Sequence, residues 1–375
     1  MKTTTLLGCL LFFGTFFGIG QELALVRHDD RFGYINRDGE MVIAPQYEKA
    51  DSFSEGLAPA MSEKKWGFLN KNGEWAIQPT YDRVKSFQSG YALVLKEDQW
   101  NYIDPSGNVL ETPVQEKYYD FENGLAFYRI EKKIGLINTK GEVVIEPTYD
   151  VIKPFVNGHA RVRNNDQWGM IDDKGKVVIP IEYDEIGDYS DQAIWARKGE
   201  SFGLVTGGDF KIITGVDKIW DFHEGSKLTY ARSDKQVGFI DTNGNWAIPA
   251  TFEKVRAFNN GLAPVYKDKK WGYIDTEGKQ VIPFMYRDAE TFADNGLAPV
   301  KEKKRWGFIN KQGNMVIPAQ YDITAGGFSL FQKNNPKGFI DGLARVKYEK
   351  KWGFIDEKGN PLGGTWYENA ELFSE

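Results

Sequence analysis

A period of 34 residues governs this chain. An aromatic or aliphatic residue followed by glycine begins the most recognisable segment of each copy, and the interval between successive glycines is 34 or 35 residues until the last, which is 46. Asn101 replaces this glycine in the third copy. A period this constant indicates a repeat protein, in which each unit buries its apolar face only against its neighbours. The ten positions are Gly33, Gly67, Asn101, Gly135, Gly169, Gly203, Gly238, Gly272, Gly307 and Gly353.

Each unit contains three short apolar segments that alternate with turn signals. In one copy these segments are residues 261–265, 271–275 and 281–282. Segments this short, with aromatic and β-branched residues between glycines and prolines, favour strands over helices. The third segment ends near a proline, which removes a ladder donor and is expected to end the pairing there. The sequence therefore predicts an all-β chain of about ten three-stranded units.

A second regular feature is an asparagine or aspartate followed three residues later by glycine. A short polar side chain can accept a hydrogen bond from the backbone two residues on, and glycine supplies the positive φ that closes a hairpin. One such side chain per unit provides too few oxygens for a calcium site. These nine pairs are therefore expected to form turns: Asn36/Gly39, Asn70/Gly73, Asp104/Gly107, Asn138/Gly141, Asp172/Gly175, Asp241/Gly244, Asp275/Gly278, Asn310/Gly313 and Asp356/Gly359.

The residue before the recurrent glycine is most often tryptophan, but Ile134 and Val237 also occupy it. Because aliphatic residues replace the ring within one chain, we expect it to pack in the core rather than to form a binding surface. The glycine would let the ring lie against backbone. The best copies of this structural pair are Trp66-Gly67, Trp168-Gly169, Trp271-Gly272, Trp306-Gly307 and Trp352-Gly353.

Lysine pairs occupy the turn between the first and second segments in five units. Stacked units would align these pairs along one edge. They would then form either a solvated stripe that protects strand edges or a docking strip for an acidic partner. These candidate partner-binding residues are Lys64, Lys65, Lys132, Lys133, Lys269, Lys270, Lys303, Lys304, Lys350 and Lys351.

The first twenty residues differ from the rest. Lys2 precedes an apolar run from Leu6 to Phe17, and small residues follow up to Gly20. This pattern predicts a signal peptide at 1–20, cleavage near Gly20-Gln21 and a repeat array over 21–375. The run is short for a membrane span, so we expect no span in the mature chain. An uncleaved anchor and lipidation at Cys9 are the alternatives.

Export would place the protein in the periplasm, at the cell surface or in the medium. Removal of Cys9, the only cysteine, leaves no thiol, disulfide or cysteine metal site. Removal of Lys2 leaves 46 basic against 53 acidic residues, a net charge of −7. This acidity argues against general nucleic-acid binding.

The pattern weakens in three places. Irregular units lie near 101–120 and 203–225, and extra residues lie near 323–338. In the sixth unit, Thr206-Gly207-Gly208-Asp209 replaces the usual turn. A broken repeat marks either a functional surface or relaxed constraint on packing.

The Trp-Gly pair, the Gly-x-x-x-Ile-x-Pro segment and the Tyr-Asp pair resemble the WG-repeat (KWG) family over residues 22–373. The resemblance implies a β-rich bacterial protein, often exported, that serves in binding or assembly without a catalytic function. It provides no functional residues to transfer.

The residues themselves show little sign of catalysis. His28, His159 and His223 lie at different phases of the repeat, so a shared metal site is not expected. Nucleophile-elbow, phosphate-loop and zinc motifs do not occur. We expect no cofactor and no enzyme activity, and paired carboxylates are the remaining catalytic alternative.

Two kinds of binding protein fit this sequence. The first is an exported scaffold for protein–protein interaction or assembly, whose partner is an unknown protein, such as one of the envelope. The second is a module that binds glycans or envelope polysaccharide through tryptophans outside the Trp-Gly pair. Those tryptophans are also suited to the core, and they are Trp75, Trp195, Trp220, Trp246 and Trp366.

Two architectures also remain. Three strands per unit are fewer than a four-stranded propeller blade has, and ten units exceed the usual number of blades. The preferred prediction is therefore an open β-hairpin solenoid, with a closed propeller-like ring as the alternative.

Overall fold

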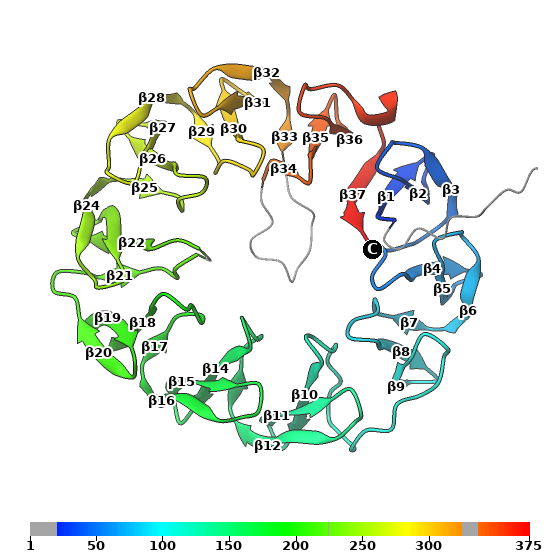
Figure 1. Cartoon of the computed structure of the whole chain (residues 1–375). Coiled ribbons are helices and arrows are strands. Elements are labelled where there is room, and N and C mark those ends of the chain that lie inside the picture. Colours follow the sequence, from blue (N-terminus) through cyan, green and yellow to red (C-terminus); the bar gives the residue numbers. More distant parts are fainter. Residues whose placement is uncertain (1–20, 224, 325–336) are drawn as a thin grey trace, which may run out of the picture.

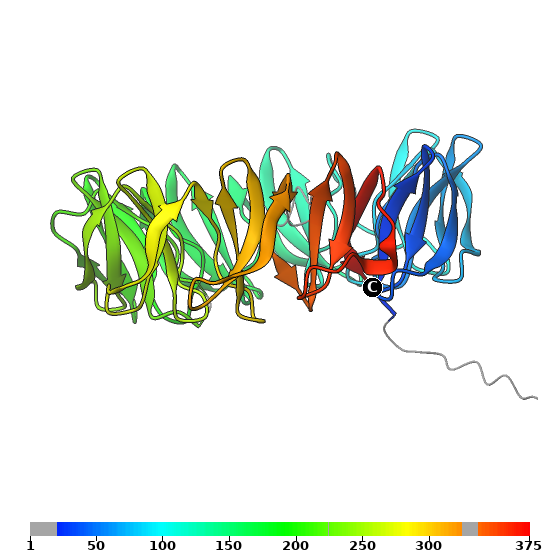
Figure 2. The same cartoon turned by 90° about the horizontal axis from the view of Figure 1, so that it is seen from above.

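The chain folds into a ring of ten small antiparallel sheets, here called blades (Figure 1). The computed structural model describes residues 21–223, 225–324 and 337–375, so the predicted signal peptide lies outside it. Viewed from the side, the ring is flat and the strands run between its two faces (Figure 2). The all-β prediction is confirmed, and the one helical element in the described residues is the short 3-10 helix η1 (Leu362–Gly364).

Blade 5 shows the common pattern. Its strands are β13 (Val151–Ile152), β14 (His159–Asn164), β15 (Gln167–Asp172) and β16 (Val177–Tyr183), paired in that order. The two-residue strand comes directly after the preceding unit's Tyr-Asp pair. Each regular unit therefore supplies four strands, not the three predicted, because the first is too short to leave an alternating apolar pattern.

Blades 6 to 9 repeat this order. Blade 6 contains β17 (Glu185–Ile186), β18 (Ile194–Lys198), β19 (Ser201–Thr206) and β20 (Asp209–Ile212). Blade 7 contains β21 (Lys218–Ile219), β22 (Leu228–Ser233), β23 (Gln236–Asp241) and β24 (Trp246–Phe252). Blade 8 contains β25 (Lys254–Val255), β26 (Ala263–Lys267), β27 (Lys270–Ile274) and β28 (Gln280–Tyr286). Blade 9 contains β29 (Asp288–Ala289), β30 (Leu297–Glu302), β31 (Arg305–Asn310) and β32 (Met315–Tyr321).

Four blades depart from this order. Blade 2 contains β4 (Ala58–Ser62), β5 (Lys65–Leu69) and β6 (Trp75–Tyr81), and blade 3 contains β7 (Arg83–Val84), β8 (Ala92–Lys96) and β9 (Gln99–Ile103). Blade 4 contains β10 (Leu125–Ile130), β11 (Lys133–Asn138) and β12 (Val143–Tyr149). Blade 10 contains β33 (Ile323–Thr324), β34 (Phe339–Ile340), β35 (Leu343–Tyr348) and β36 (Lys351–Ile355).

Blade 1 joins the two ends of the described chain. Its strands β1 (Leu23–His28), β2 (Arg31–Ile35) and β3 (Met41–Tyr47) come from the first unit, and β37 (Asn369–Ser374) completes the sheet. Strand β37 pairs antiparallel with β1, with Ala24 opposite Phe373 and Val26 opposite Ala370. Figure 1 shows β37 and β1 side by side.

The preferred prediction of an open solenoid is therefore wrong, and the alternative ring is confirmed. An open array would leave the edge of β1 unpaired, and an exposed edge favours pairing with another strand. Here the last strand of the same chain occupies that edge. Residues 325–336, most of the predicted insertion, lie outside the described residues.

Neighbouring blades meet through a repeated aromatic contact. The ring that follows the Trp-Gly glycine in one blade packs against a phenylalanine of the next blade, with centroids 4.7–5.1 Å apart. Such pairs contribute about 0.5–1.5 kcal/mol beyond the burial of their area. Seven pairs occur in the described residues: Tyr34–Phe53, Phe68–Phe87, Tyr102–Phe121, Phe239–Phe258, Tyr273–Phe292, Phe308–Phe339 and Phe354–Phe373.

The recurrent glycine makes room for backbone rather than for the neighbouring ring. A Cβ atom at Gly67 would lie 2.5 Å from the carbonyl oxygen of Ile77 and 2.7 Å from the nitrogen of Pro79. Strand β6 bulges at this point, because its register shifts between the pairs that β5 makes at Trp66 and Phe68. The proline lies within the strand and does not end it, contrary to the prediction. Its missing N–H is tolerated because the bulge leaves this position unpaired.

The bulge predicts a measurable difference between two glycines. Gly67→Ala should lower the free energy of unfolding by about 3 kcal/mol, because the outer-strand backbone must move. Gly90 has a φ of +82° but open space around it, so Gly90→Ala should cost only about 1–2 kcal/mol, the penalty of a left-handed backbone. Urea unfolding of both variants measures the difference. An equal or smaller loss at Gly67 would contradict the packing described here.

Ring closure predicts the effect of removing residues 369–375. Without β37, β1 loses its partner and Phe354 loses Phe373. The truncated chain should unfold at a lower temperature and scatter X-rays as a wider particle than the intact chain. Phe373→Leu, which keeps the strand and an apolar side chain, serves as the control and should remain compact. An unchanged radius of gyration after truncation would contradict closure by β37.

Candidate functional site

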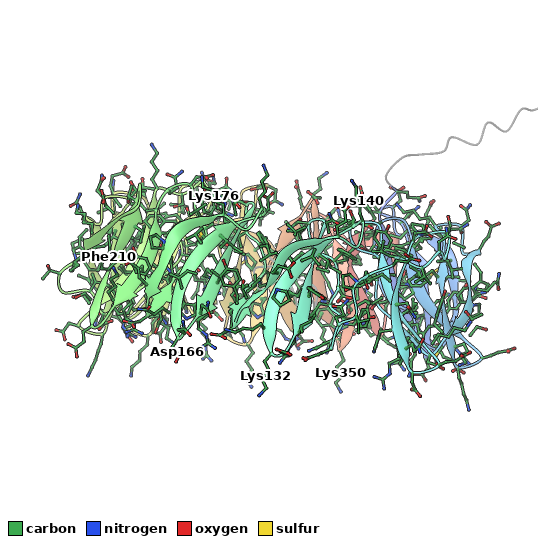
Figure 3. The ribbon with its side chains drawn as sticks, turned by 90° about the horizontal axis from the view of Figure 1, so that it is seen from below. Lys132, Lys140, Asp166, Lys176, Phe210 and Lys350 are labelled. Carbon is green, nitrogen blue, oxygen red and sulfur yellow. The ribbon has the colours of Figure 1, made fainter. Side chains whose placement is uncertain are left out.

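The two faces of the ring are built from different turns. On one side, here called the hairpin face, two-residue turns join the longer central strands of each blade. Both turn residues have positive φ in most blades, for example Glu131 (47°) and Lys132 (68°). Lys132, Asp166 and Lys350 project from this face, whereas Lys140 and Lys176 project from the opposite face (Figure 3). The opposite face carries the Asn/Asp-to-glycine turns.

These latter turns form as the sequence predicts. The side-chain oxygen of Asn36 accepts hydrogen bonds from the backbone of Asp38 (3.0 Å) and Glu40 (2.9 Å), and Gly39 has a φ of +82°. The same pair of bonds recurs at Asn70, Asp104, Asn138, Asp172, Asp241, Asp275, Asn310 and Asp356. The acidic members are thus occupied by turn hydrogen bonds.

The ten candidate lysines lie on the hairpin face in two roles. Lys65 and Lys133 start a strand and pair with the aspartate of their unit's Tyr-Asp motif, Asp82 and Asp150, the latter pair at 2.6 Å. Among the described residues, no ion pair forms at Lys64, Lys132, Lys269, Lys270, Lys303, Lys304, Lys350 or Lys351. Acidic turns interrupt the set, as at Asp29-Asp30 and Glu97-Asp98, so the lysines do not form a continuous strip.

Asp150 illustrates how this face holds two blades together. It bonds Lys133 of blade 4 and also accepts the backbone N–H of Asn165, in the turn of blade 5, at 3.0 Å. The hydrogen bond from Lys133 is the main cause of the lowered pKa of Asp150, and the Asn165 N–H adds to it. The carboxylate therefore links neighbouring blades.

The tryptophans of the Trp-Gly pairs lie close to the same face. Trp271 and Trp306 are buried, whereas Trp66, Trp168 and Trp352 are half-buried. Basic side chains lie over several of these indoles: Arg163 lies 5.7 Å from the ring centroid of Trp168, and Arg345 lies 4.0 Å from that of Trp352. Trp168, Trp271, Trp306 and Trp352 also pack against apolar clusters of the blades.

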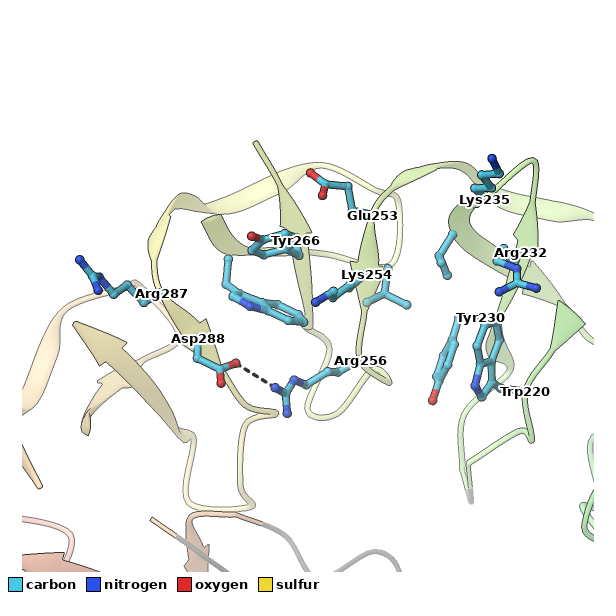
Figure 4. Close-up of a pocket in the computed structure, with 13 residues that line it drawn as sticks. Trp220, Tyr230, Arg232, Lys235, Glu253, Lys254, Arg256, Tyr266, Arg287 and Asp288 are labelled. Carbon is cyan, nitrogen blue, oxygen red and sulfur yellow. Dashed lines mark hydrogen bonds and ion pairs between the residues drawn. The ribbon is translucent and has the colours of Figure 1, made fainter. Parts of the chain in front are cut away.

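An open trough of about 690 Å³ crosses blades 7, 8 and 9 (Figure 4). This size is within the range of small-molecule and peptide sites. Four aromatic side chains line it, namely Trp220, Tyr230, Tyr266 and Trp271. Five basic side chains also line it, namely Arg232, Lys235, Lys254, Arg256 and Arg287, against two acidic ones, Glu253 and Asp288.

One end of the trough lies where the residue before the recurrent glycine is small. Val237 is the smallest of the ten residues that precede the recurrent glycine, and it lines the trough. Arg232 lies opposite Val237 in the register, as Arg163 lies opposite Trp168 in blade 5. With no indole at this position, the groove beside Arg232 stays open.

Aromatic rings and cations alternate along the trough. The Trp220 and Tyr230 rings lie 4.9 Å apart, and Lys218 lies 4.6 Å from the Trp220 ring centroid. Farther along, Tyr266 and Trp271 lie 5.4 Å apart, with Lys254 and Arg256 over them at 5.4 and 4.9 Å, respectively. These are cation–π distances.

The basic groups of the trough differ in how they are neutralised. Arg256 pairs with Asp288 at 2.8 Å and with the buried Glu290, which also binds Lys337 at 2.9 Å. Arg232 pairs with Asp217 at 2.6 Å. Within the described part of the chain, Lys235, Lys254 and Arg287 form no ion pair. The trough therefore carries excess positive charge on a chain whose net charge is −6.

Only one of the five tryptophans proposed as glycan contacts lines this trough. Trp75, Trp195, Trp246 and Trp366 pack against apolar clusters of the core. Trp220 is the one that lines the trough. Sequence reasoning missed Tyr230, Arg232, Tyr266 and Arg287, although Trp220 lies in the irregular segment near 203–225.

A metal site and a membrane-spanning helix each place requirements on the described residues. No group of three or more His, Cys, Asp or Glu side chains in this part of the chain is placed to hold a metal ion. His159 stacks on Tyr189 with centroids 3.7 Å apart, and His28 is in a different blade. None of the helical structure described for the chain has the length and apolarity needed to cross a membrane.

The fold defines the class: a β-propeller-like ring built from tandem repeats. The WG containing repeat family matches the chain at residues 32–66, 66–100, 102–133, 134–168, 168–201, 238–271, 271–306 and 306–335. These matches cover more than half of the sequence, and the chain belongs to this family. The family resemblance seen in the sequence is confirmed. The unmatched segment 202–237 contains Trp220, Tyr230 and Val237.

The fold, and the fold alone, has a counterpart among solved structures of low sequence identity. The crystal structure of the eukaryotic initiation factor superposes with a TM-score of 0.53 at 10% identity, covering 94% of this chain and 98% of that one. Dihydro-heme d1 dehydrogenase NirN gives a TM-score of 0.37 at 9% identity, covering 94% and 75% of the two chains. No curated protein matches this chain significantly.

The inter-blade carboxylate makes a pH prediction. Because the pKa of Asp150 is lowered in the folded state, its stabilisation should be complete above its ordinary pKa of 3.8 and should be lost as the pH falls through the folded value. Lys133→Met should raise the pKa of Asp150, whereas Lys132→Met, in the adjacent turn, should leave it unchanged. Carbon-detected NMR titration of labelled aspartate measures both. A rise in the pKa of Asp150 in the Lys132 variant alone would contradict the assignment of Lys133 as its partner.

Proposed function

We propose that this protein is a non-catalytic scaffold that binds a protein partner on its hairpin face. The observation that carries the proposal is the trough across blades 7 to 9, which reaches the hairpin face at the turn residue Lys235. Trp, Tyr and Arg line it, and these are the residue types most enriched in protein–protein hot spots. The unpaired turn lysines around the same face would attract an acidic partner and guide its approach.

The proposal includes export. The pattern of residues 1–20 favours a cleaved signal peptide, which would deliver the ring to the periplasm, the cell surface or the medium. A ring closed by its own last strand suits such a location, because β37 covers the edge of β1 that would otherwise be open to other strands. The partner would then be another envelope or secreted protein.

Site-specific photo-cross-linking tests which face binds. A photoreactive residue in place of Lys132, Asp166 or Lys350 samples the hairpin face, and one in place of Lys140 or Lys176 samples the opposite face (Figure 3). In the native cell envelope, one discrete adduct should form from the hairpin-face set and none from the other. Adducts from the opposite face, or from neither face, would contradict the proposal.

A further inference from the structure

A segment that departs from the repeat supplies one end of the trough. Residues 202–237 lie outside the family matches, and from them come Trp220, Tyr230, Arg232, Lys235 and Val237. Natural sequences that break their own local rules tend to do so at functional sites. A random loss of repeat quality would not be expected to leave aromatic and basic residues converging on one open trough.

We propose that the trough between blades 7 and 9 is the recognition site for an acidic peptide segment of the partner, with apolar side chains between its carboxylates. This inference rests on the proposed function and specifies the chemistry of the site. Arg232 and Lys235 lie at one end of the trough and Arg287 at the other, with Lys254 between the two ends (Figure 4).

Charge explains why the ligand is acidic. Lys235, Lys254 and Arg287 have no carboxylate within 4.0 Å in the described part of the chain, whereas Arg256 and Arg232 are neutralised by Asp288 and Asp217. Arg256 is thus a fixed part of the wall, and the three unpaired cations remain available. Carboxylates placed along an extended segment would neutralise them, and such complementarity raises both specificity and association rate.

The aromatic pairs explain why the ligand also has apolar side chains. The Trp220–Tyr230 pair and the Tyr266–Trp271 pair lie at separate places along the trough. Each offers an amphipathic surface that loses little conformational entropy on binding. A segment that contains both acidic and apolar residues would bring carboxylates to the unpaired cations and hydrophobic groups to the two aromatic pairs.

A neutral glycan fits this site less well. Recognition of sugar hydroxyls needs acceptors as well as donors. Of the two carboxylates that line the trough, Asp288 is already bound by Arg256. The remaining polar groups are mainly cations, which donate only. An acidic polysaccharide is the relevant competitor, and the test includes it.

The test fills the trough with the side chain that other blades carry. Val237→Trp would place an indole opposite Arg232, as Trp168 lies opposite Arg163, so the ring should stay folded while the groove closes. Ile134→Trp in blade 4 is the matched control. It also places an indole opposite an arginine, Arg129, but far from the trough. Circular dichroism and thermal unfolding should show both variants to be as stable as the parent.

The probe is a short fluorescein-labelled peptide of alternating glutamate and leucine, followed by fluorescence anisotropy with the purified protein. The glutamate peptide should bind, and its glutamine counterpart should bind at least about tenfold more weakly. Val237→Trp and Tyr230→Ala should each weaken binding about 30-fold, which is the size of a hot-spot loss. Arg287→Glu should weaken it at least about tenfold, and Ile134→Trp should not change it.

Three results would overturn the assignment. They are no binding of the glutamate peptide, equal binding to the parent and to Val237→Trp, or tighter binding of polygalacturonate than of the peptide at the same site. Cross-linking separates this inference from the proposed function. If a hairpin-face adduct persists in Val237→Trp, the trough is not the recognition site but the scaffold proposal stands. If the peptide binds but no adduct forms, the scaffold proposal fails and the trough remains a peptide-binding site.

Discussion

The contact between the buried residue after the recurrent glycine of one blade and an aromatic ring of the next is the interaction on which this structure depends. It pairs two rings at seven junctions of the described chain, whereas Leu136, Met170 and Leu204 hold the first position in blades 4, 5 and 6. Each blade is too small to bury its own apolar face, so its stability comes from its two neighbours. The rings after the Trp-Gly glycine, such as Phe68 and Tyr273, are fully buried by this contact. The same distance recurs across the junction of the two chain ends, where Phe354 and Phe373 lie 4.7 Å apart. Closure therefore adds one more copy of an existing joint rather than a new kind of interface.

The constancy of the joint leaves the rest of each unit free to vary. The turn on one face is fixed by a side-chain hydrogen bond and a glycine, whereas the two-residue hairpin on the other face accepts Glu-Lys, Asn-Asp or Asp-Asp. Residues near the hairpin face can change without loosening the joint, as Val237 does next to the intact Phe239–Phe258 contact. The candidate site arises in this tolerant zone, where packing is relaxed but the blade still holds its place.

Much of the fold could be predicted from the sequence, because period, turn residues and strand-like segments are local signals. The repeat family, the all-β class and the Asn/Asp-to-glycine turns followed from such signals. Closure did not, because the pairing of β1 with β37 joins residues almost a full chain length apart and leaves no local pattern. The two-residue strands, such as β13, were also missed, and without them each unit has one strand fewer than a four-stranded blade.

The candidate site was harder to predict than the fold for a related reason. Lysine pairs stand out in the sequence, but Lys65 and Lys133 turn out to be bound to aspartates of their own units. The trough depends on a missing side chain at Val237 and on residues of three successive blades, a combination that no single repeat displays. Trp220 was noticed as a tryptophan out of phase, but its neighbour Tyr230 has no unusual position in the sequence.

The distance between hairpin turns across the closing junction tests the account most directly. Spin labels at Asp29 and Glu349, in the turns of blades 1 and 10, can be compared by pulsed electron paramagnetic resonance with labels at Glu63 and Glu97, in blades 2 and 3. All four residues hold the first position of their turns, with φ between 47° and 50°, so the labels are equivalent. With Cys9 replaced by serine, a closed ring predicts the same distance for both pairs. A 29–349 distance far longer than the 63–97 distance would show an open array and contradict the account.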